Sequence, residues 1–148
     1  MIVAPYFDLN IKRFTQPARA IFAQARKEAA TTSELGQPES RLIAPIHIAQ
    51  ALQEVVTNGA GIKIDDGRFP ESGSELYHWL TPGSCYSLQN AVPEEGEVTP
   101  LDFARALLTV RDAIGINEGL GGQLMDKGIN LEEIEKKLAS ALKNEAAT

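Results

Sequence analysis

The sequence predicts an all-α fold, and three features of the chain support this class. Alanine and leucine are plentiful while aromatic residues make up only 6% of the chain, a balance that favours closely packed helices over a β-sandwich. Apolar residues recur at helical spacing in several segments, and we find no segment with the pattern of a strand. One helical segment also occurs twice. These features predict a helical domain with an internal duplication.

The duplicated segment runs from Ile43 to Val55 and reappears from Val98 to Val110, at a constant offset of 55 residues. Five positions are identical: Pro45/Pro100, Ala49/Ala104, Ala51/Ala106, Leu52/Leu107 and Val55/Val110. The prolines suit the first turn of a helix, where a missing N–H costs nothing. In the second copy Thr99 and Asp102 have the spacing of a capping box. Helices over about 45–56 and 100–110 are therefore predicted.

Each of these helices is expected to follow another helix. In the first unit that helix runs from about Gln16 to Ala30 with Thr15 as its N-cap, and its apolar stripe is Ala18, Ile21, Phe22, Ala25 and Ala29. In the second unit it is shorter, from about Pro82 to Val92, where Pro93 stops it. The polar stretches 31–41 and 58–74 are predicted to be a loop and a linker with little regular structure.

The chain is expected to close with a helix that begins after Asn130 and reaches about Leu142. Its apolar positions are Leu131, Ile134, Leu138, Ala141 and Leu142. Gly128 is predicted to end a short helix before it, and Glu133 with Lys137 offers an i,i+4 ion pair. We interpret residues 1–148 as one domain with repeat 1 at about 13–64, a linker at about 65–78, repeat 2 at about 79–142 and a polar tail at 143–148.

Composition excludes several classes of function. The net charge of −6, with no cluster of Lys and Arg, argues against binding to nucleic acid. Cys85 is the single cysteine, so no intrachain disulfide can form and a reducing compartment is expected. No apolar run approaches the roughly 20 residues of a membrane span, and residues 1–8 lack the pattern of a signal peptide. These observations predict a cytoplasmic protein that does not bind membranes.

The motifs of catalysis and cofactor binding are also missing. No G-x-x-x-x-G-K-[ST] motif is present, so nucleotide binding is not expected, and the glycines of 119–122 are interpreted as a loop between helices. His78 and Cys85 would share a helix face only across Pro82 and Gly83, which makes a catalytic dyad improbable. His47 is interpreted as a structural histidine that bonds the loop before it. We expect no catalytic residue, no metal ligand and no cofactor.

The residues resemble the N-terminal domain of Clp-type AAA+ unfoldases over most of the chain, from about Arg13 to Leu142. The first helix is similar at Arg13, Phe14, Thr15, Ala18, Ala23, Ala25, Glu28 and Ala29. The second is similar through Ile43-x-Pro45-x-His47-x-x-x-Ala51-Leu52, and the second unit through Thr81-Pro82 and Leu124-x-x-x-Gly128-Ile129-Asn130. The resemblance implies two tandem Clp repeats, related by a pseudo-twofold axis in a bundle of about eight helices.

In function, the resemblance implies a non-catalytic module that recruits clients or adaptors to a hexameric Clp-type AAA+ ATPase. The branch of the family that binds phosphorylated arginine has a Glu where this chain has Ile46 and Leu101, so that ligand is not expected. Two alternatives stay open. The chain could be the severed N-terminal domain of a full Clp ATPase, or a small hydrolase that uses Cys85.

Five residues are candidates for protein binding. Phe14 and Thr15 match the start of the family's first helix, beside which the family forms an apolar groove for clients and adaptors. Phe69, Tyr77 and Trp79 belong to an aromatic group, with Tyr86, in or just after the predicted linker. These aromatics either fill the seam between the two repeats or form an exposed patch that captures a partner, since Trp and Tyr dominate binding hot spots.

Overall fold

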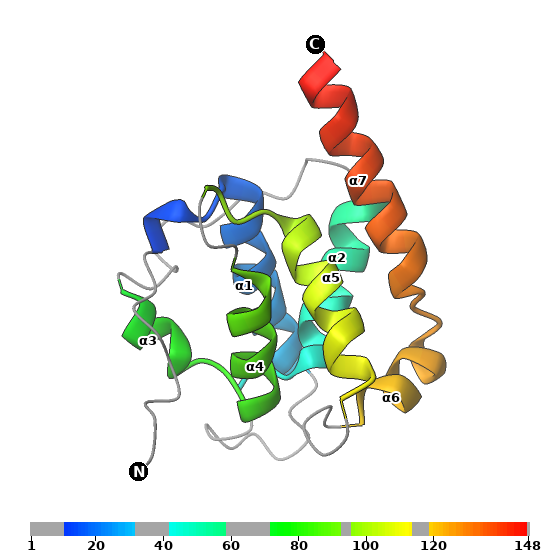
Figure 1. Ribbon diagram of the computed structural model, residues 1–148. Coiled ribbons are helices and arrows are strands. Elements are labelled where there is room, and N and C mark those ends of the chain that lie inside the picture. The colour runs from blue at the N-terminus through cyan, green and yellow to red at the C-terminus, as the bar shows by residue number, and fades with distance from the viewer. Residues whose placement is uncertain (1–10, 32–41, 59–71, 93–95, 114–118, 148) are drawn as a thin grey trace.

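The computed structural model describes residues 11–31, 42–58, 72–92, 96–113 and 119–147. These residues form a short 3₁₀ helix and seven α-helices, and the two β-bridges described below lie outside any strand (Figure 1). The elements are η1 (Ile11–Arg13), α1 (Gln16–Thr31), α2 (Pro45–Asn58), α3 (Gly73–Tyr77), α4 (Pro82–Ala91), α5 (Pro100–Arg111), α6 (Leu120–Lys127) and α7 (Leu131–Ala147). The predicted all-α class is confirmed.

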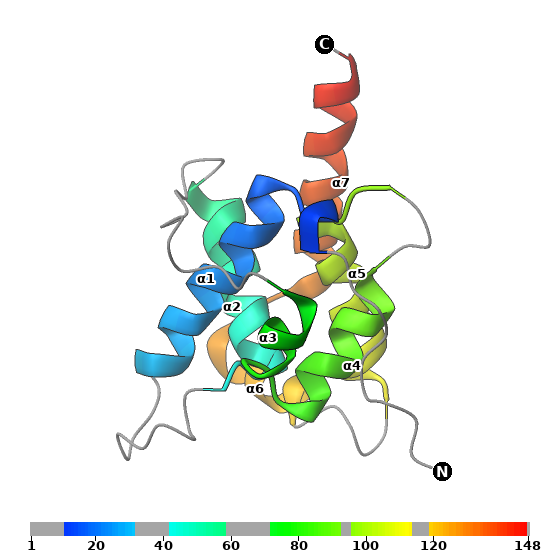
Figure 2. The same ribbon diagram turned by 90° about the vertical axis from the view of Figure 1, so that its left-hand side faces the viewer.

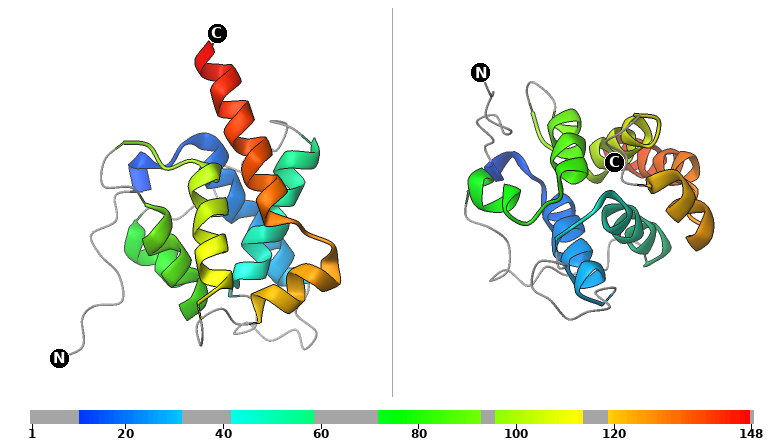
Figure 3. Two further views of the ribbon diagram at one scale, coloured as in Figure 1. Left: turned by 45° about the vertical axis from the view of Figure 1, so that its right-hand side comes forward. Right: turned by 90° about the horizontal axis from the view of Figure 1, so that it is seen from below.

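The body of the molecule consists of two helix pairs that pack against each other. Helix α1 packs on α2, α4 packs on α5, and the pairs meet mainly through α2 and α5. Helix α7 lies along α5 and α2, and its C-terminal part extends beyond the other helices (Figures 2 and 3). Helix α6 precedes it and contacts both α2 and α5. The duplicated segments therefore form the two central helices.

Helices α1, α4 and α7 begin where the sequence predicts, because polar side chains satisfy their first backbone N–H groups. The hydroxyl of Thr15 accepts from the N–H of Ala18 at 3.2 Å at the start of α1, and Thr81 accepts from Ser84 at 3.3 Å at the start of α4. Asn130 accepts from the N–H of Glu133 at 3.1 Å at the start of α7. Each of α2, α4 and α5 has a proline as its first residue.

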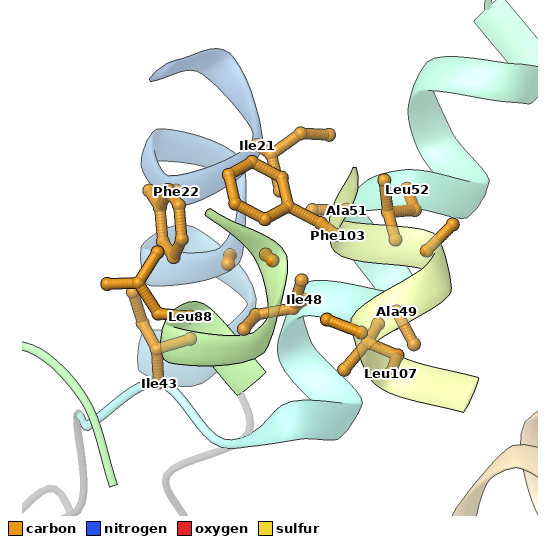
Figure 4. Close-up of a cluster of buried hydrophobic side chains, with 14 of the residues drawn as sticks. Ile21, Phe22, Ile43, Ile48, Ala49, Ala51, Leu52, Leu88, Phe103 and Leu107 are labelled. Carbon is orange, nitrogen blue, oxygen red and sulfur yellow. The ribbon is translucent and has the colours of Figure 1, made fainter. Parts of the chain in front are cut away.

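The core lies between the two helix pairs. All five positions of the apolar stripe predicted for α1 are buried. Figure 4 shows Ile21 and Phe22 of α1 in one cluster with residues of the other three helices of the two pairs, among them Ile48, Leu88, Phe103 and Leu107. Small alanines on α1 and α2 allow the two helices to approach closely, since Ala18, Ala25, Ala49 and Ala51 are fully buried.

Three sequence predictions need correction. Gly121 and Gly122, interpreted as a loop, lie inside α6, and the helix begins after Gly119, whose φ of 76° is left-handed. Helix α3 lies inside the predicted linker of 65–78, because Ser72 caps it by accepting from the N–H of Glu75 at 3.1 Å. The predicted tail of 143–148 continues α7 as far as Ala147. The loop of 32–41 and most of the linker lie outside the described residues.

Candidate functional site

Two short backbone junctions connect the helix pairs. At the first junction the residues before α1 pair with those before α5 in a parallel bridge between Phe14 and Val98. The N–H of Thr15 donates to the carbonyl of Val98 at 3.1 Å, and the N–H of Val98 donates to the carbonyl of Arg13 at 2.9 Å. A segment 83 residues further along the chain thus fixes the start of α1.

The second junction has the same pattern with the roles of the helix pairs exchanged. Here Ile43, before α2, forms a parallel bridge with Leu80, before α4. The N–H of Thr81 donates to the carbonyl of Ile43 at 3.0 Å, and the N–H of Ile43 donates to the carbonyl of Trp79 at 2.8 Å. All four bridged side chains of the two junctions, Phe14, Val98, Ile43 and Leu80, are buried.

A side-chain hydroxyl strengthens each junction. At the first junction the hydroxyl of Thr15 donates to the carbonyl of Val98 at 3.2 Å. At the second junction the donor to the carbonyl of Ile43 is the hydroxyl of Ser84, which is fully buried, at 2.6 Å. The two carbonyls therefore each receive one backbone and one hydroxyl hydrogen bond.

The residue in the first turn of each central helix also bonds back to the junction. In α5 the carboxylate of Asp102 accepts from the N–H of Thr99 at 2.8 Å, as the predicted capping box requires. In α2 the ring nitrogen Nδ1 of His47 accepts from the N–H of Ala44 at 2.9 Å. Burial lowers the pKa of His47 from its ordinary value, with Glu28 acting to raise it and Lys127 to lower it. The predicted structural role of His47, bonding the loop before it, is confirmed.

The outward surfaces of the two junctions differ in chemistry. The residues that precede the buried pairs are exposed or only partly buried, so they form the outward side of each junction. At the first junction these outward positions hold Arg13 and Glu97, and at the second they hold Trp79 and Leu42. Leu42 is 38% exposed, and Trp79 is partly buried against the core. One junction thus presents a charged pair and the other an aromatic and aliphatic pair.

A cation completes the surface at the second junction. The guanidinium carbon of Arg26 on α1 lies 4.0 Å from the ring centroid of Trp79. Arg26 and the neighbouring Lys27 are exposed. Stacking on an aromatic face leaves the donors of an arginine oriented for a carboxylate. We call the surface formed by Leu42, Trp79 and Arg26 the Trp79 surface.

The residues predicted to bind protein fall in different places. Phe14 is only 3% exposed, and its ring centroid lies 6.0 Å from that of Phe22 and 5.9 Å from that of Phe103. Tyr77 is 6% exposed and belongs to the core, so a partner has almost no access to either ring. Thr15 uses its hydroxyl at the first junction, whereas Trp79 lies at the second. Phe69 lies outside the described residues.

Sequence reasoning did not identify Leu42 and Arg26 as members of this surface. Leu42 follows the polar stretch 31–41, and no motif around it in the sequence indicates a binding surface. Arg26 lies outside the apolar stripe predicted for its helix, as the charged residues of an exposed helix face do. Their proximity to Trp79 depends on the pairing of Ile43 with Leu80 across 37 residues, which has no local signal in the sequence.

The described parts of the chain give less support to a catalytic site, a metal site or a ligand cavity. Cys85 lies in α4, which begins at Pro82 after the Thr81 cap, while His78 caps the end of α3, so the two residues do not share a helix. No group of three or more metal-ligating side chains occurs among the described residues. A cavity of about 100 Å³ lies between α2 and the start of α7, lined by Gln53, Val56, Gly128, Asn130, Glu133, Ile134 and Lys137. It has room for a few water molecules.

Comparisons with family models, with curated proteins and with solved structures give no significant match to this chain. No helix within the described ranges is both long enough and apolar enough to cross a membrane.

Proposed function

We propose that this chain is a non-catalytic protein-binding module of the Clp N-terminal type. It would recruit clients or adaptors to a Clp-type AAA+ chaperone or protease, or dock on that ATPase directly. The observation that carries the proposal is the pair of matching junctions, which gives the duplication in the sequence a counterpart in three dimensions. Together with the family-like residues quoted above, it supports two tandem copies of one helical repeat.

The matching of the junctions is detailed. Exchanging the two helix pairs places Thr15 on Thr81 and Val98 on Ile43, and every backbone hydrogen bond of one junction then falls on a bond of the other. His47 and Asp102 exchange as well, and both accept from the N–H three residues earlier. A pseudo-twofold relation between the pairs α1–α2 and α4–α5 accounts for all of these bonds.

The Trp79 surface is where we propose that the partner binds. Its equivalent at the first junction is Arg13 with Glu97, so the aromatic character belongs to one half only and is not required by the backbone pairing. An aromatic ring supplies contact area at low entropic cost, and the stacked Arg26 adds a cation. The surface suits a segment of a client or adaptor that has an apolar side chain next to a carboxylate.

The proposal also covers activity and nucleotides. The chain is expected to turn over no substrate and to bind no ATP, because it lacks a phosphate-binding motif and Cys85 has no base on its own helix. The same domain at the front of a full Clp ATPase would bind partners in the same way. A reading frame that continues past Thr148 into the phosphate-binding motif G-x-x-x-x-G-K-[ST] would identify the chain as the N-terminal domain of such an ATPase.

The test is a binding measurement with purified components, using calorimetry with the Clp-type AAA+ ATPase of the same cell, its adaptor, and a permanently unfolded client. We expect micromolar binding to at least one of them, and we expect Trp79→Ala to weaken it by about tenfold or more. Met125→Ala is the matched control, because Met125 is an 83% exposed apolar residue on α6. Thermal melts of both variants show whether the fold is retained.

Two results would contradict the proposal. If none of the three partners binds at concentrations 100-fold above the expected dissociation constant, the proposed protein-binding function is wrong. Equal affinity of the wild type and a folded Trp79→Ala variant would remove the Trp79 surface while leaving the function in place.

A further inference from the structure

The bond between His47 and Ala44 links a titratable ring to the backbone of the second junction. Nδ1 can accept from the N–H of Ala44, at 2.9 Å, only while it has a free lone pair. Ala44 directly follows Ile43, whose N–H and carbonyl form the junction with Trp79, Thr81 and Ser84. The ring of His47 therefore holds the residue next to the junction.

Protonation would remove this bond completely. An imidazolium has an N–H at both nitrogens and no acceptor, so Nδ1–H would face the N–H of Ala44. The equivalent bond in α5 is different, because the carboxyl group of Asp102 keeps an acceptor oxygen whether or not it is ionised. The two junctions thus have the same geometry, but acid removes this bond only at the second junction.

Among the residues that the structure describes, two charged groups act on His47. Glu28 on α1 favours the imidazolium and Lys127 on α6 opposes it, and burial of the ring is the largest influence. Helix α4 has no charged side chain. On α5 and α7, Arg105 pairs with Glu135, Arg111 pairs with Glu132, and Lys137 pairs with Glu133, while Asp102 bonds Thr99.

We infer that His47 is an acid-sensitive latch of the second junction, closed by the neutral ring and released by the imidazolium. Because burial lowers the pKa of His47, the folded protein binds this proton less readily than the unfolded chain does. The stability from the latch is therefore complete above about pH 6.5, the ordinary value for histidine, and is lost as the pH falls below it. Release would loosen Ala44, the residue next to Ile43, whose N–H donates to the carbonyl of Trp79. An effect on partner binding at the Trp79 surface is the only consequence that rests on the proposed function.

The experiment reads the latch without any partner. In an NMR titration from pH 7.5 to 5, we expect the Ala44 amide to lose its hydrogen-bonded shift and to exchange at least about tenfold faster, relative to its intrinsic rate, while Thr99 does not. Emission of Trp79, the single tryptophan, should change with the same midpoint. His47→Asp copies the residue at the equivalent position of α5 and should abolish this transition.

The second histidine of the chain provides the control. His78 is next to Trp79 and can quench its fluorescence, so a change in emission alone could come from either histidine. His78→Asn removes this second source and should leave the Ala44 transition unchanged. Asp102→His should create an equivalent transition at Thr99, which tests the latch even if His47→Asp does not fold at pH 7.5. An equal response of Ala44 and Thr99 in the wild type, or an Ala44 transition that persists in His47→Asp, would overturn the inference.

Discussion

Ser84 shows at the scale of one residue how the second junction is held. Its fully buried hydroxyl donates to the carbonyl of Ile43 at 2.6 Å, beside the N–H of Thr81. We expect Ser84→Ala to lower the free energy of unfolding by about 0.5–1.5 kcal/mol, the usual net value of a hydrogen bond. The loss should be small because Thr81 still satisfies the carbonyl, and because the equivalent position in the first turn of α1 is already an alanine, Ala18.

Urea denaturation at pH 7.5 measures this loss. Ser140→Ala, at an exposed position of α7, is the control and should stay within about 0.5 kcal/mol of the wild type. A loss above about 3 kcal/mol for Ser84→Ala would mean that the Ile43 carbonyl is left without adequate hydrogen bonding.

Single residues also show where sequence reasoning succeeds. Thr15 as a cap and Thr99 with Asp102 as a capping box could be predicted, because both patterns depend on spacing within one turn of helix. The direction of Phe14 could not be predicted, because it depends on Phe103, 89 residues away, whose ring centroid is 5.9 Å from that of Phe14. A residue just before a helix can point to either side, and only the tertiary partner decides.

At the scale of elements, apolar contacts rather than ion pairs should hold α7 against the body. Ile134 is 2% exposed, whereas Arg105 and Glu135, which join α5 to α7 at 3.5 Å, are 60% and 36% exposed. We expect Ile134→Ala to cost about 2–5 kcal/mol, and Arg105→Gln to cost less than about 1 kcal/mol. Chemical denaturation of the two variants gives both values, and 0.5 M NaCl, which screens the exposed pair, should lower the cost of Arg105→Gln and leave that of Ile134→Ala unchanged. A larger loss for Arg105→Gln would show that the ion pairs dominate.

The four paired helices could be predicted, because α1, α2 and α5 have apolar residues at helical spacing and Pro82 and Pro93 bound α4. The glycines of α6 were misread, since glycine disfavours a helix in isolation but is tolerated where Leu120 and Leu124 bury one face. Helix α3 was missed although Ser72 and Glu75 have the spacing of a capped helix start. Five residues are too few for the apolar periodicity that identified the longer helices.

At the scale of the whole molecule, the repeated segment can be recognised in the sequence and the junctions cannot. The offset of 55 residues relates α2 to α5 within the sequence. The junctions instead pair the start of each central helix with the start of the other pair's first helix. One bridged residue on each side leaves no alternating pattern to recognise, so the contact surface of Leu42, Trp79 and Arg26 could only be found in three dimensions.

This crossed pairing predicts that neither half folds alone. The first junction needs Phe14 from one half and Val98 from the other, and the second needs Ile43 and Leu80, so cutting the chain removes both. Each half would also expose the apolar face that its central helix buries against the other pair, and chains of about 70 residues have little stability to spare.

We therefore expect fragments 1–71 and 72–148 to show no cooperative melt separately, and to regain helicity as a 1:1 complex when mixed. The intact chain should unfold in one transition, with far-UV circular dichroism and Trp79 emission giving the same midpoint. Circular dichroism and sedimentation of the fragments, alone and mixed, provide the measurement. A cooperative melt of fragment 1–71 by itself would show that the first helix pair is an independent unit, and that the junctions connect two domains rather than complete one.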